Sequence, residues 1–384
     1  MRWAGTDHCD EGLEDVRRNA EGFILPLTLW MIAIMGLVAA ALNVWVANAV
    51  ANSRTLARRT QLELAQSNIT NELIYMLGTR PTSYRGLEVG QEITFADSND
   101  FNAVMAGPSD SGRTLKFDAR PYVSESNPDV VVTLQDGGGL LNLNITTPTN
   151  LRRTLTSFDI PEPEINRLID TLLDYIDEDD LTRLAGAEKT QYDRLGLVPP
   201  ANGLLLTPFE AQRIIGWDKL DTVWKADMAA PLLTTCRGAG FNPNTAPAAA
   251  LVANIRGLTR DKADQTIEAR AQRPFRNIRE FGAAADILIT DEPFFYTFVP
   301  GTCFIVDLVD RPSGLHTRYS LTLEPTSQTR PWRVDYATRI PAQYRSALDH
   351  LDPEAHFPTP ESIDLSSGPD LGKPKLQQPV LLGR

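Results

Sequence analysis

An uncharged stretch near the N-terminus constrains this chain more than any other feature. Residues 23–53 contain no Asp, Glu, Lys or Arg and are mostly apolar. A run of about thirty such residues exceeds the ~20 that a helix needs to cross a bilayer. Its large apolar side chains would point all round the helix axis, whereas a helix of a soluble core would keep a polar face. The sequence therefore predicts a membrane-spanning helix.

A polar leader, residues 1–22, precedes this run. A cleaved secretory signal has a basic start and a shorter apolar core, so this run is too long to be one. A glycine directly before a Phe-led apolar helix, here Gly22 before Phe23, resembles the cleavage site of type IV prepilins and pseudopilins. The resemblance implies that a prepilin peptidase cuts after Gly22. Most of that family has Glu at the fifth mature position, where this chain has Leu27, and the K-type minor pseudopilin of type II secretion also lacks it.

Composition argues against several classes of function. The 384 residues carry a formal net charge of −12, whereas a protein that binds nucleic acid through its phosphates needs a basic surface. Of four histidines, only His316 lies between the leader and the C-terminal tail, which argues against a His-based catalytic or metal centre. We find no nucleophile elbow, P-loop or dinucleotide fingerprint, and we predict that the protein is not an enzyme.

Strand-like segments lie on both sides of a long helical middle section. We expect the first helix to continue, amphipathic, to about residue 77, where Gly78 and Pro81 end it. Alternating or β-branched residues then predict strands. Those strands are residues 92–95, 115–119, 130–134, 303–309, 315–323 and 332–337. Between them, residues 140–298 are mostly of helical character.

The middle section contains a repeat. Residues 141–151 align with residues 241–251 without a gap, through a shared Leu/Phe-Asn-x-Asn pattern. Each copy is followed by a helix, a turn and a second helix, predicted at 151–157 and 164–176, and at 248–255 and 261–270. Asn144 or Thr147, and Asn244 or Thr245, are suited to cap the first helix of each pair.

The paired motifs, the helix-hairpin-helix pattern, residues 274–281 and the pilin junction without Glu together resemble the K-type minor pseudopilin of the type II secretion system. The resemblance implies an α+β fold. A transmembrane and spine helix precedes a pilin-like antiparallel sheet, which carries a large inserted α-helical domain with helix-hairpin-helix (SAM-like) repeats. The implied boundaries are a leader at 1–22, the helix at 23–78, sheet at 79–139 and 299–340, the inserted domain at 140–298, and a disordered Pro-rich tail at 341–384.

The same resemblance implies the function, the partners and the location. The chain would be a minor pseudopilin at the tip of the pseudopilus, beside the I-type and J-type minor subunits, and needed for export of folded proteins. It would be a single-pass protein of the bacterial inner membrane with its folded domains in the periplasm. The alternative is a membrane-anchored, helix-hairpin-helix DNA-binding protein of the competence type. The acidic charge of the chain disfavours that alternative.

An acidic cluster is the one candidate metal site. Residues 174–180 hold five carboxylates, and Glu188 and Asp193 follow. Calcium prefers six to eight oxygen ligands and tolerates loop geometry. We predict Asp177, Asp179, Glu188 and Asp193 as its ligands, with some support from the resemblance, since some K-type subunits carry calcium. The spacing differs from an EF-hand, and a solvated acidic loop is the alternative.

Two cysteines outside the leader, Cys236 and Cys303, form a candidate disulfide. Both would lie outside the cytoplasm, where disulfides persist. The bond would tie the inserted domain to the sheet. The alternative is a pair of buried free thiols.

Overall fold

The computed structural model describes residues 24–80, 82–89, 114–124, 127–224, 232–238, 240–289, 295–324, 326–340 and 355–357. Compactness divides the chain into two units, residues 1–61 and 62–384, and the boundary falls inside the first helix. We describe each unit by itself. The predicted cleavage site at Gly22 and Phe23 and the predicted strand at 92–95 lie outside the described residues.

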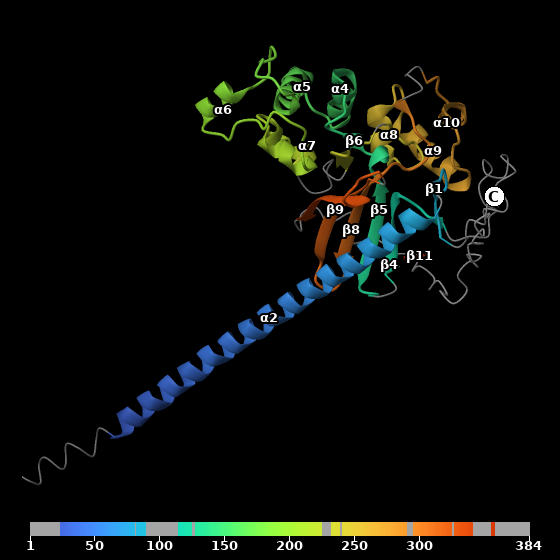
Figure 1. Cartoon of the computed structure of the whole chain (residues 1–384). Helices are drawn as coiled ribbons and strands as arrows, with labels where there is room; N and C mark the ends of the chain where they lie inside the picture. The colour runs from blue at the N-terminus through green and yellow to red at the C-terminus, as the bar shows by residue number, and fades with distance from the viewer. Residues whose placement is uncertain are drawn as a thin grey trace, which may run out of the picture. The chain divides into compact units, whose positions relative to one another are not determined.

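Helix α2 (Ile24–Thr79) is the long N-terminal helix of the chain (Figure 1). Its portion in the first unit buries no side chain, and large apolar residues such as Leu29, Trp30 and Trp45 stand exposed. By length and composition this helix is able to cross a membrane, and its most apolar window is entirely unburied. Such a surface is stable in lipid or against other apolar helices, and unfavourable in water.

The second unit begins where α2 acquires a buried face. Leu62, Ala65, Ile69, Leu73 and Met76 repeat every three or four residues and are each 5% exposed or less. This spacing places them on one side of the helix. They pack with the inward-facing apolar residues of a sheet in one shared core. The amphipathic continuation to about residue 77 is thus confirmed.

The main sheet has the strand order β10-β9-β8-β5-β4-β11. Neighbours are antiparallel except β11 and β4, which are parallel. The strands are β4 (Asp118–Ser124), β5 (Val130–Asp136), β8 (Cys303–Asp310), β9 (Leu315–Leu323), β10 (Trp332–Arg339) and β11 (Ala355–Phe357). The predicted hairpin of β8 and β9 is confirmed, with Asp310 opposite Leu315 beside the turn.

Two smaller sheets complete the strands. β1 (Thr82–Ser83), β2 (Gly86–Glu88) and β3 (Thr114–Leu115) form one, and β6 (Leu141–Asn142) pairs in parallel with β7 (Leu233–Thr234) in the other.

The predicted disordered tail needs correction at three residues. Strand β11 lies within 341–384, and the rest of that range lies outside the described residues. Phe357 is 1% exposed and meets the ring of Tyr122 edge-on at 6.4 Å. Sequence composition missed this strand because one buried aromatic residue in a polar segment carries no periodic signal.

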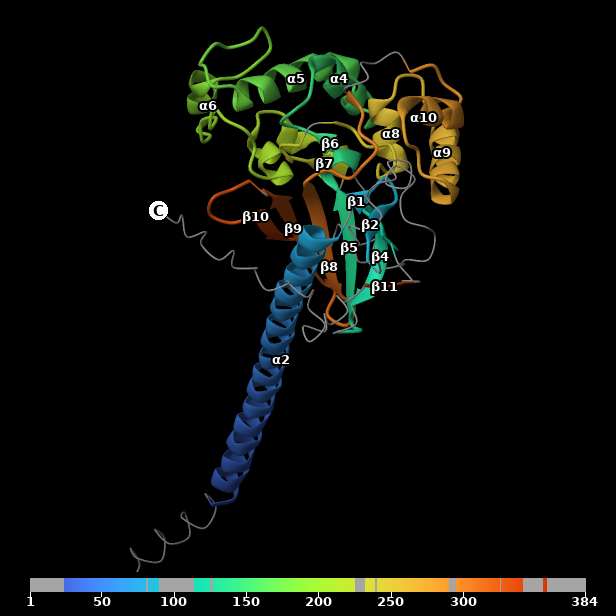
Figure 2. The same cartoon turned by 45° about the vertical axis from the view of Figure 1, so that its right-hand side comes forward.

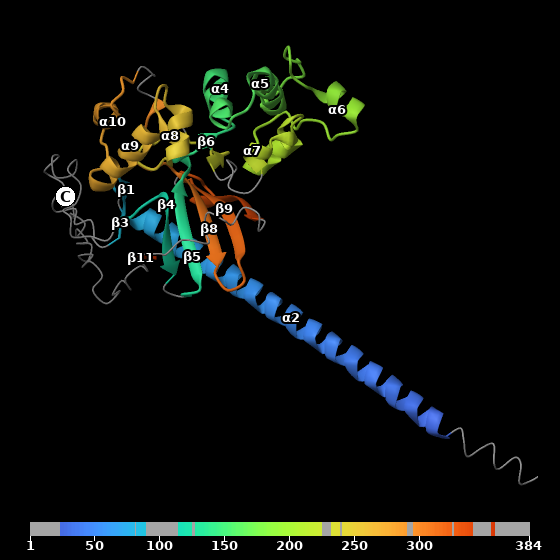
Figure 3. The same cartoon turned by 180° about the vertical axis from the view of Figure 1, so that it is seen from behind.

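The inserted helical domain lies between β5 and β8 and gathers at one end of the sheet (Figures 2 and 3). Its α-helices are α4 (Pro148–Ser157), α5 (Glu162–Ile176), α6 (Lys189–Leu195), α7 (Asp221–Trp224), α8 (Ala248–Asn254), α9 (Arg260–Gln272) and α10 (Ile278–Ala285). Short 3₁₀ turns occupy Gly137–Gly139, Pro208–Arg213 and Trp217–Lys219. The four helices that the repeat predicts are therefore present as α4, α5, α8 and α9.

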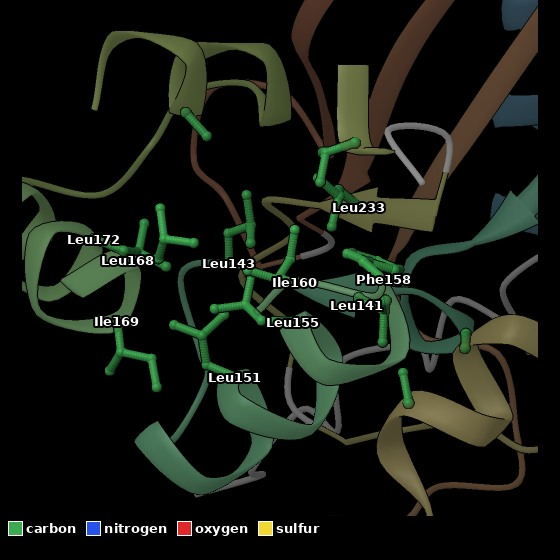
Figure 4. Packing of buried hydrophobic residues seen from close by; sticks show 14 of the residues in the cluster. Leu141, Leu143, Leu151, Leu155, Phe158, Ile160, Leu168, Ile169, Leu172 and Leu233 are labelled. Atoms are coloured by element: carbon green, nitrogen blue, oxygen red, sulfur yellow. The ribbon is translucent and has the colours of Figure 1, made fainter. Parts of the chain in front are cut away.

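A second core holds the inserted domain together, separate from the core under the sheet. Figure 4 shows Leu151 and Leu155 of α4 facing the same interior as Leu143 and Ile160, with Leu168 and Leu172 of α5 beside them. Helix α4 also packs against α8, so the first helices of the two predicted pairs meet.

A disulfide joins this domain to the sheet. Cys236 follows β7, Cys303 begins β8, and their Cα atoms lie 5.9 Å apart. The bond passes beside Gly137, where an added Cβ would stand 2.3 Å from the Sγ of Cys236. Any larger residue at position 137 would therefore collide with the bridge.

We predict that the C-terminal part of α2, from Leu62 onward, contributes to stability through its buried face. Leu73→Ala should lower the free energy of unfolding of the second unit by ~2–5 kcal/mol, because a buried methyl cluster is lost and a cavity is left. Denaturant unfolding of the full chain in detergent measures this. Leu64→Ala on the same helix is the control, since Leu64 is 60% exposed. Equal losses in both variants would contradict the packing described here.

We predict that Cys236 and Cys303 are oxidised in the protein. In a Cys9→Ser background, the denatured chain should show no thiol that reacts with maleimide before reduction and two after it. The sequence separation is 67 residues, and loop-closure entropy then gives a stabilisation of roughly 4 kcal/mol. Two reactive thiols before reduction would refute the pairing.

Candidate functional site in the inserted domain

Asp136, the last residue of β5, lies where the chain leaves the sheet and is 0% exposed. Its carboxylate accepts hydrogen bonds from the backbone N–H groups of Gly138 (3.0 Å) and Gly301 (3.1 Å). It also accepts from Asn242 Nδ2 (2.9 Å) and Thr245 Oγ1 (3.0 Å). Burial raises the pKa of Asp136, and the four donors oppose that shift. The residue connects the start, middle and end of the inserted domain.

The second Asn-x-Asn motif connects two loops through side-chain hydrogen bonds. Asn244 Nδ2 donates to the carbonyl oxygens of Phe275 (2.8 Å) and Phe298 (2.9 Å), and its Oδ1 accepts from the Phe275 N–H (2.9 Å). Asn242 Oδ1 accepts from the N–H of Asn244 (3.0 Å) and so orients the motif. One side chain thus satisfies backbone groups from two distant segments.

The first Asn-x-Asn motif makes the same pattern of hydrogen bonds. Asn144 Nδ2 donates to the carbonyl oxygens of Leu205 (3.0 Å) and Thr235 (3.1 Å), and its Oδ1 accepts from the Leu205 N–H (2.9 Å). Asn142 Oδ1 accepts from the N–H of Asn144 (2.9 Å). The sequence repeat is therefore a repeat of hydrogen bonding as well as of helices.

The predicted caps are partly wrong. Thr147 does cap α4, accepting from the N–H of Asn150 at 3.2 Å. Helix α8, however, begins after Pro247, without a side-chain cap. Asn244 and Thr245 do not cap it because their polar groups are used across the domain, on Phe275, Phe298 and Asp136.

His316 belongs to a buried ion network on the sheet. Its Nε2 lies 2.7 Å from Asp307 Oδ1, and Arg318 contacts both oxygens of Asp307 at 2.8 and 2.9 Å. Burial alone would raise the pKa of Asp307, but Arg318 and His316 hold it well below the usual range. This network pairs the buried charges of β8 and β9.

The acidic cluster lies around the C-terminal end of α5. Asp174 is 0% exposed, and Arg183 Nη1 pairs with Asp174 (2.7 Å) and Asp177 (2.5 Å). Gly186 lies against this carboxylate, since an added Cβ would stand 1.9 Å from Asp174 Oδ2. A guanidinium therefore already occupies the space between two of the carboxylates.

Glu188 is the unusual member of the cluster. It is 3% exposed, and neither carboxylate oxygen has a hydrogen-bond partner in the described chain. Burial, followed by the charges of Asp174 and Asp177, raises its pKa to about 7. Asp177 Oδ1 is likewise buried without a partner.

The predicted metal ligands are only partly brought together. Asp177 and Glu188 lie in this cluster, whereas Asp179 and Asp193 are exposed. Among the described residues, no three His, Cys, Asp or Glu side chains are arranged to hold a metal ion. The predicted ligand set left out Asp174, a member of the predicted cluster that is fully buried, and the sequence analysis did not identify Arg183 as the counter-charge.

Comparison with known proteins gives a match in the segment that contains the second Asn-x-Asn motif. Residues 241–290 match the family model described as type II secretion system (T2SS), protein K. No curated protein matches the sequence. A solved chain in the crystal structure of the GspK-GspI-GspJ complex from the enterotoxigenic Escherichia coli type 2 secretion system is 18% identical, with a TM-score of 0.41. That match covers 56% of this chain and 80% of the other.

The family match spans the second Asn-x-Asn motif and helices α8, α9 and α10. Through this segment the chain is identified as similar to protein K of the type II secretion system, as the sequence resemblance predicted.

Proposed function

We propose that the chain is a K-type minor pseudopilin, a non-enzymatic subunit at the tip of the type II secretion pseudopilus. The observation that carries this proposal is the family match over residues 241–290. That segment contains the second Asn-x-Asn motif and two of the four donors to the Asp136 carboxylate, Asn242 and Thr245. In this role the chain supports pseudopilus assembly and the export of folded proteins across the outer membrane.

The N-terminal helix supports membrane anchoring. Its exposed apolar half is able to span a bilayer, and its other half has a buried face in the second unit. We propose a single-pass protein of the bacterial inner membrane with its folded domains in the periplasm, where the Cys236–Cys303 bond persists. A prepilin peptidase would remove residues 1–22.

The partners follow from the same proposal. We propose that the apolar half of α2 packs beside the corresponding helices of the I-type and J-type minor subunits. Leu27 replaces the Glu with which other pilin-like subunits pair the amino terminus of a neighbour. A subunit without that Glu is suited to a terminal position, and the inserted domain would prevent stacking of further subunits.

The helix–turn–helix pairs α4–α5 and α8–α9 are proposed to be helix-hairpin-helix (SAM-like) units used for protein structure rather than for DNA. In the second pair, Arg260 faces Asp264 (3.4 Å), and Lys262 binds the side chain and carbonyl of Asp286 (3.0 and 2.8 Å). These cations are already paired, so they do not form the open basic surface that phosphate binding needs. The competence-type alternative has no supporting observation.

We further propose that the acidic cluster takes up calcium. The proposal rests on Glu188, whose two oxygens are buried and unpartnered beside Asp174 and Asp177. Crowded buried carboxylates are unfavourable without a cation, and hard oxygen ligands suit calcium. Arg183 compensates part of the negative charge of the cluster. A calcium ion bound by Glu188 and Asp177 would compensate the rest.

Calcium should raise the melting temperature of the full chain in detergent. Ligand that binds only the folded state adds about 2.7 kcal/mol at one hundred times its Kd. Glu188→Gln should abolish the difference between calcium and chelator, because it removes a ligand charge. Glu178→Gln is the matched control at an exposed position and should keep the difference. Superimposable melting curves of the parent chain in calcium and in chelator would reject the calcium proposal.

Processing tests the pseudopilin proposal itself. In cells with a prepilin peptidase, N-terminal sequencing of the membrane-extracted chain should begin at Phe23. Gly22→Ala should leave the leader attached, because the peptidase recognises that glycine. Gly36→Ala is the control, since an added Cβ there meets nothing within 4 Å, and it should be processed normally. A wild-type chain that begins at Met1, or that is cut beyond the apolar run, would rule out this function.

A further inference from the structure

A small cationic pocket lies where the second helix pair meets the edge of the sheet region. It has a volume of about 70 Å³. Arg85 from the β1–β2 turn, Lys116 and Arg120 from the β3–β4 segment, and Arg270 from α9 line it, together with a single acidic residue, Asp118. Four cations around one carboxylate are notable in a chain with a net charge of −12.

The one carboxylate of the pocket is already engaged. Arg120 Nε donates to Asp118 Oδ1 at 2.8 Å and Arg120 Nη2 donates to Oδ2 at 2.7 Å, a two-pronged pair. Such a bidentate contact occupies both oxygens. Asp118 therefore forms its ion pair with Arg120 and not with Lys116 or Arg270.

Arg270 is the most deeply placed of these cations, with 8% of its surface exposed. Its Nη1 donates to the carbonyl oxygens of Pro243 and Ala246, both at 2.6 Å. These bonds satisfy hydrogen atoms but supply no negative charge, and no carboxylate of the described chain forms an ion pair with Arg270. Burial lowers the pKa of Arg270 to about 10, and the nearby charge of Asp118 opposes this shift only in part.

Lys116 is the second cation of the pocket that forms no ion pair with a described residue. It is half-buried, and its ammonium makes no ion pair or hydrogen bond with the described residues. Burial and then the charge of Arg120 lower its pKa. The charge of Asp118 opposes this shift, and the charges of Arg270 and Arg85 add to it. Lys116 is therefore close enough to these guanidinium groups to feel their repulsion.

We propose that this pocket binds one small oxyanion, a phosphate or carboxylate group, between Lys116 and Arg270. The bound group would supply the charge that the pocket lacks and would receive charge-assisted hydrogen bonds. Lys116 lies next to the core of the sheet, and Arg270 belongs to helix α9 of the inserted domain. A bound anion would therefore also connect the sheet to the inserted domain. The volume of the pocket suits a group of this size.

Thermal unfolding and calorimetric titration of the full chain in detergent test this site. The probes are inorganic phosphate and acetate, each compared with chloride at equal ionic strength. We expect a saturable rise in the melting temperature, roughly 2 °C at ten times the Kd. A response to phosphate alone identifies a phosphate site, and a response to acetate as well identifies a site that also accepts carboxylates. Either response supports the proposal.

Variants locate the effect. Lys116→Ala should abolish the anion-dependent rise, Lys116→Arg should keep it, and Lys219→Ala, which removes an exposed lysine, should leave it unchanged. An equal rise in Lys116→Ala would show that the anions act on the whole protein and would overturn the site. The absence of saturable binding to the unmodified chain would also overturn it, whatever the fate of the variants.

Discussion

One buried carboxylate holds the inserted domain to the sheet. Strands β5 and β8 are hydrogen-bonded neighbours, yet the whole inserted domain separates them in sequence. Asp136 closes this long connection by accepting bonds from Gly138 at its start, Asn242 and Thr245 in its middle and Gly301 at its end. The Cys236–Cys303 bond lies beside it. These contacts lie between the two large hydrophobic cores of residues 62–384, which form one compact unit, and a small third cluster contains both cysteines.

Sequence reasoning succeeded where the signal was local or repeated. The uncharged run predicted the first half of α2 because length and composition alone decide such a helix. The β8–β9 hairpin followed from a turn between two apolar segments. The repeat of Asn-x-Asn predicted both helix pairs, and the leucines of α4 and α5 are buried as expected. The match to protein K then fell on the second copy of the repeat.

It failed where a side chain acts on a distant segment. Asn244 was suited by its local position to a helix cap, but it bonds to Phe275 and Phe298 instead. The sequence analysis did not single out Asp136, Arg183 or Arg270. Their burial and partners depend on chain segments that meet only in three dimensions, so single-sequence patterns carry no signal for them. Asp179 and Asp193 were predicted as metal ligands, but both are exposed. The spacing of acidic residues in the sequence does not reveal which carboxylates converge.

We propose that this chain works as a subunit of a pseudopilus and that its apolar helix associates with helices of the same kind. Affinity purification of the full chain from detergent-solubilised membranes of its own cells, followed by mass spectrometry, tests this most directly. We predict that the I-type and J-type minor pseudopilins co-purify with it in comparable amounts. A chain that is recovered without either subunit, from cells that express both, would contradict the account.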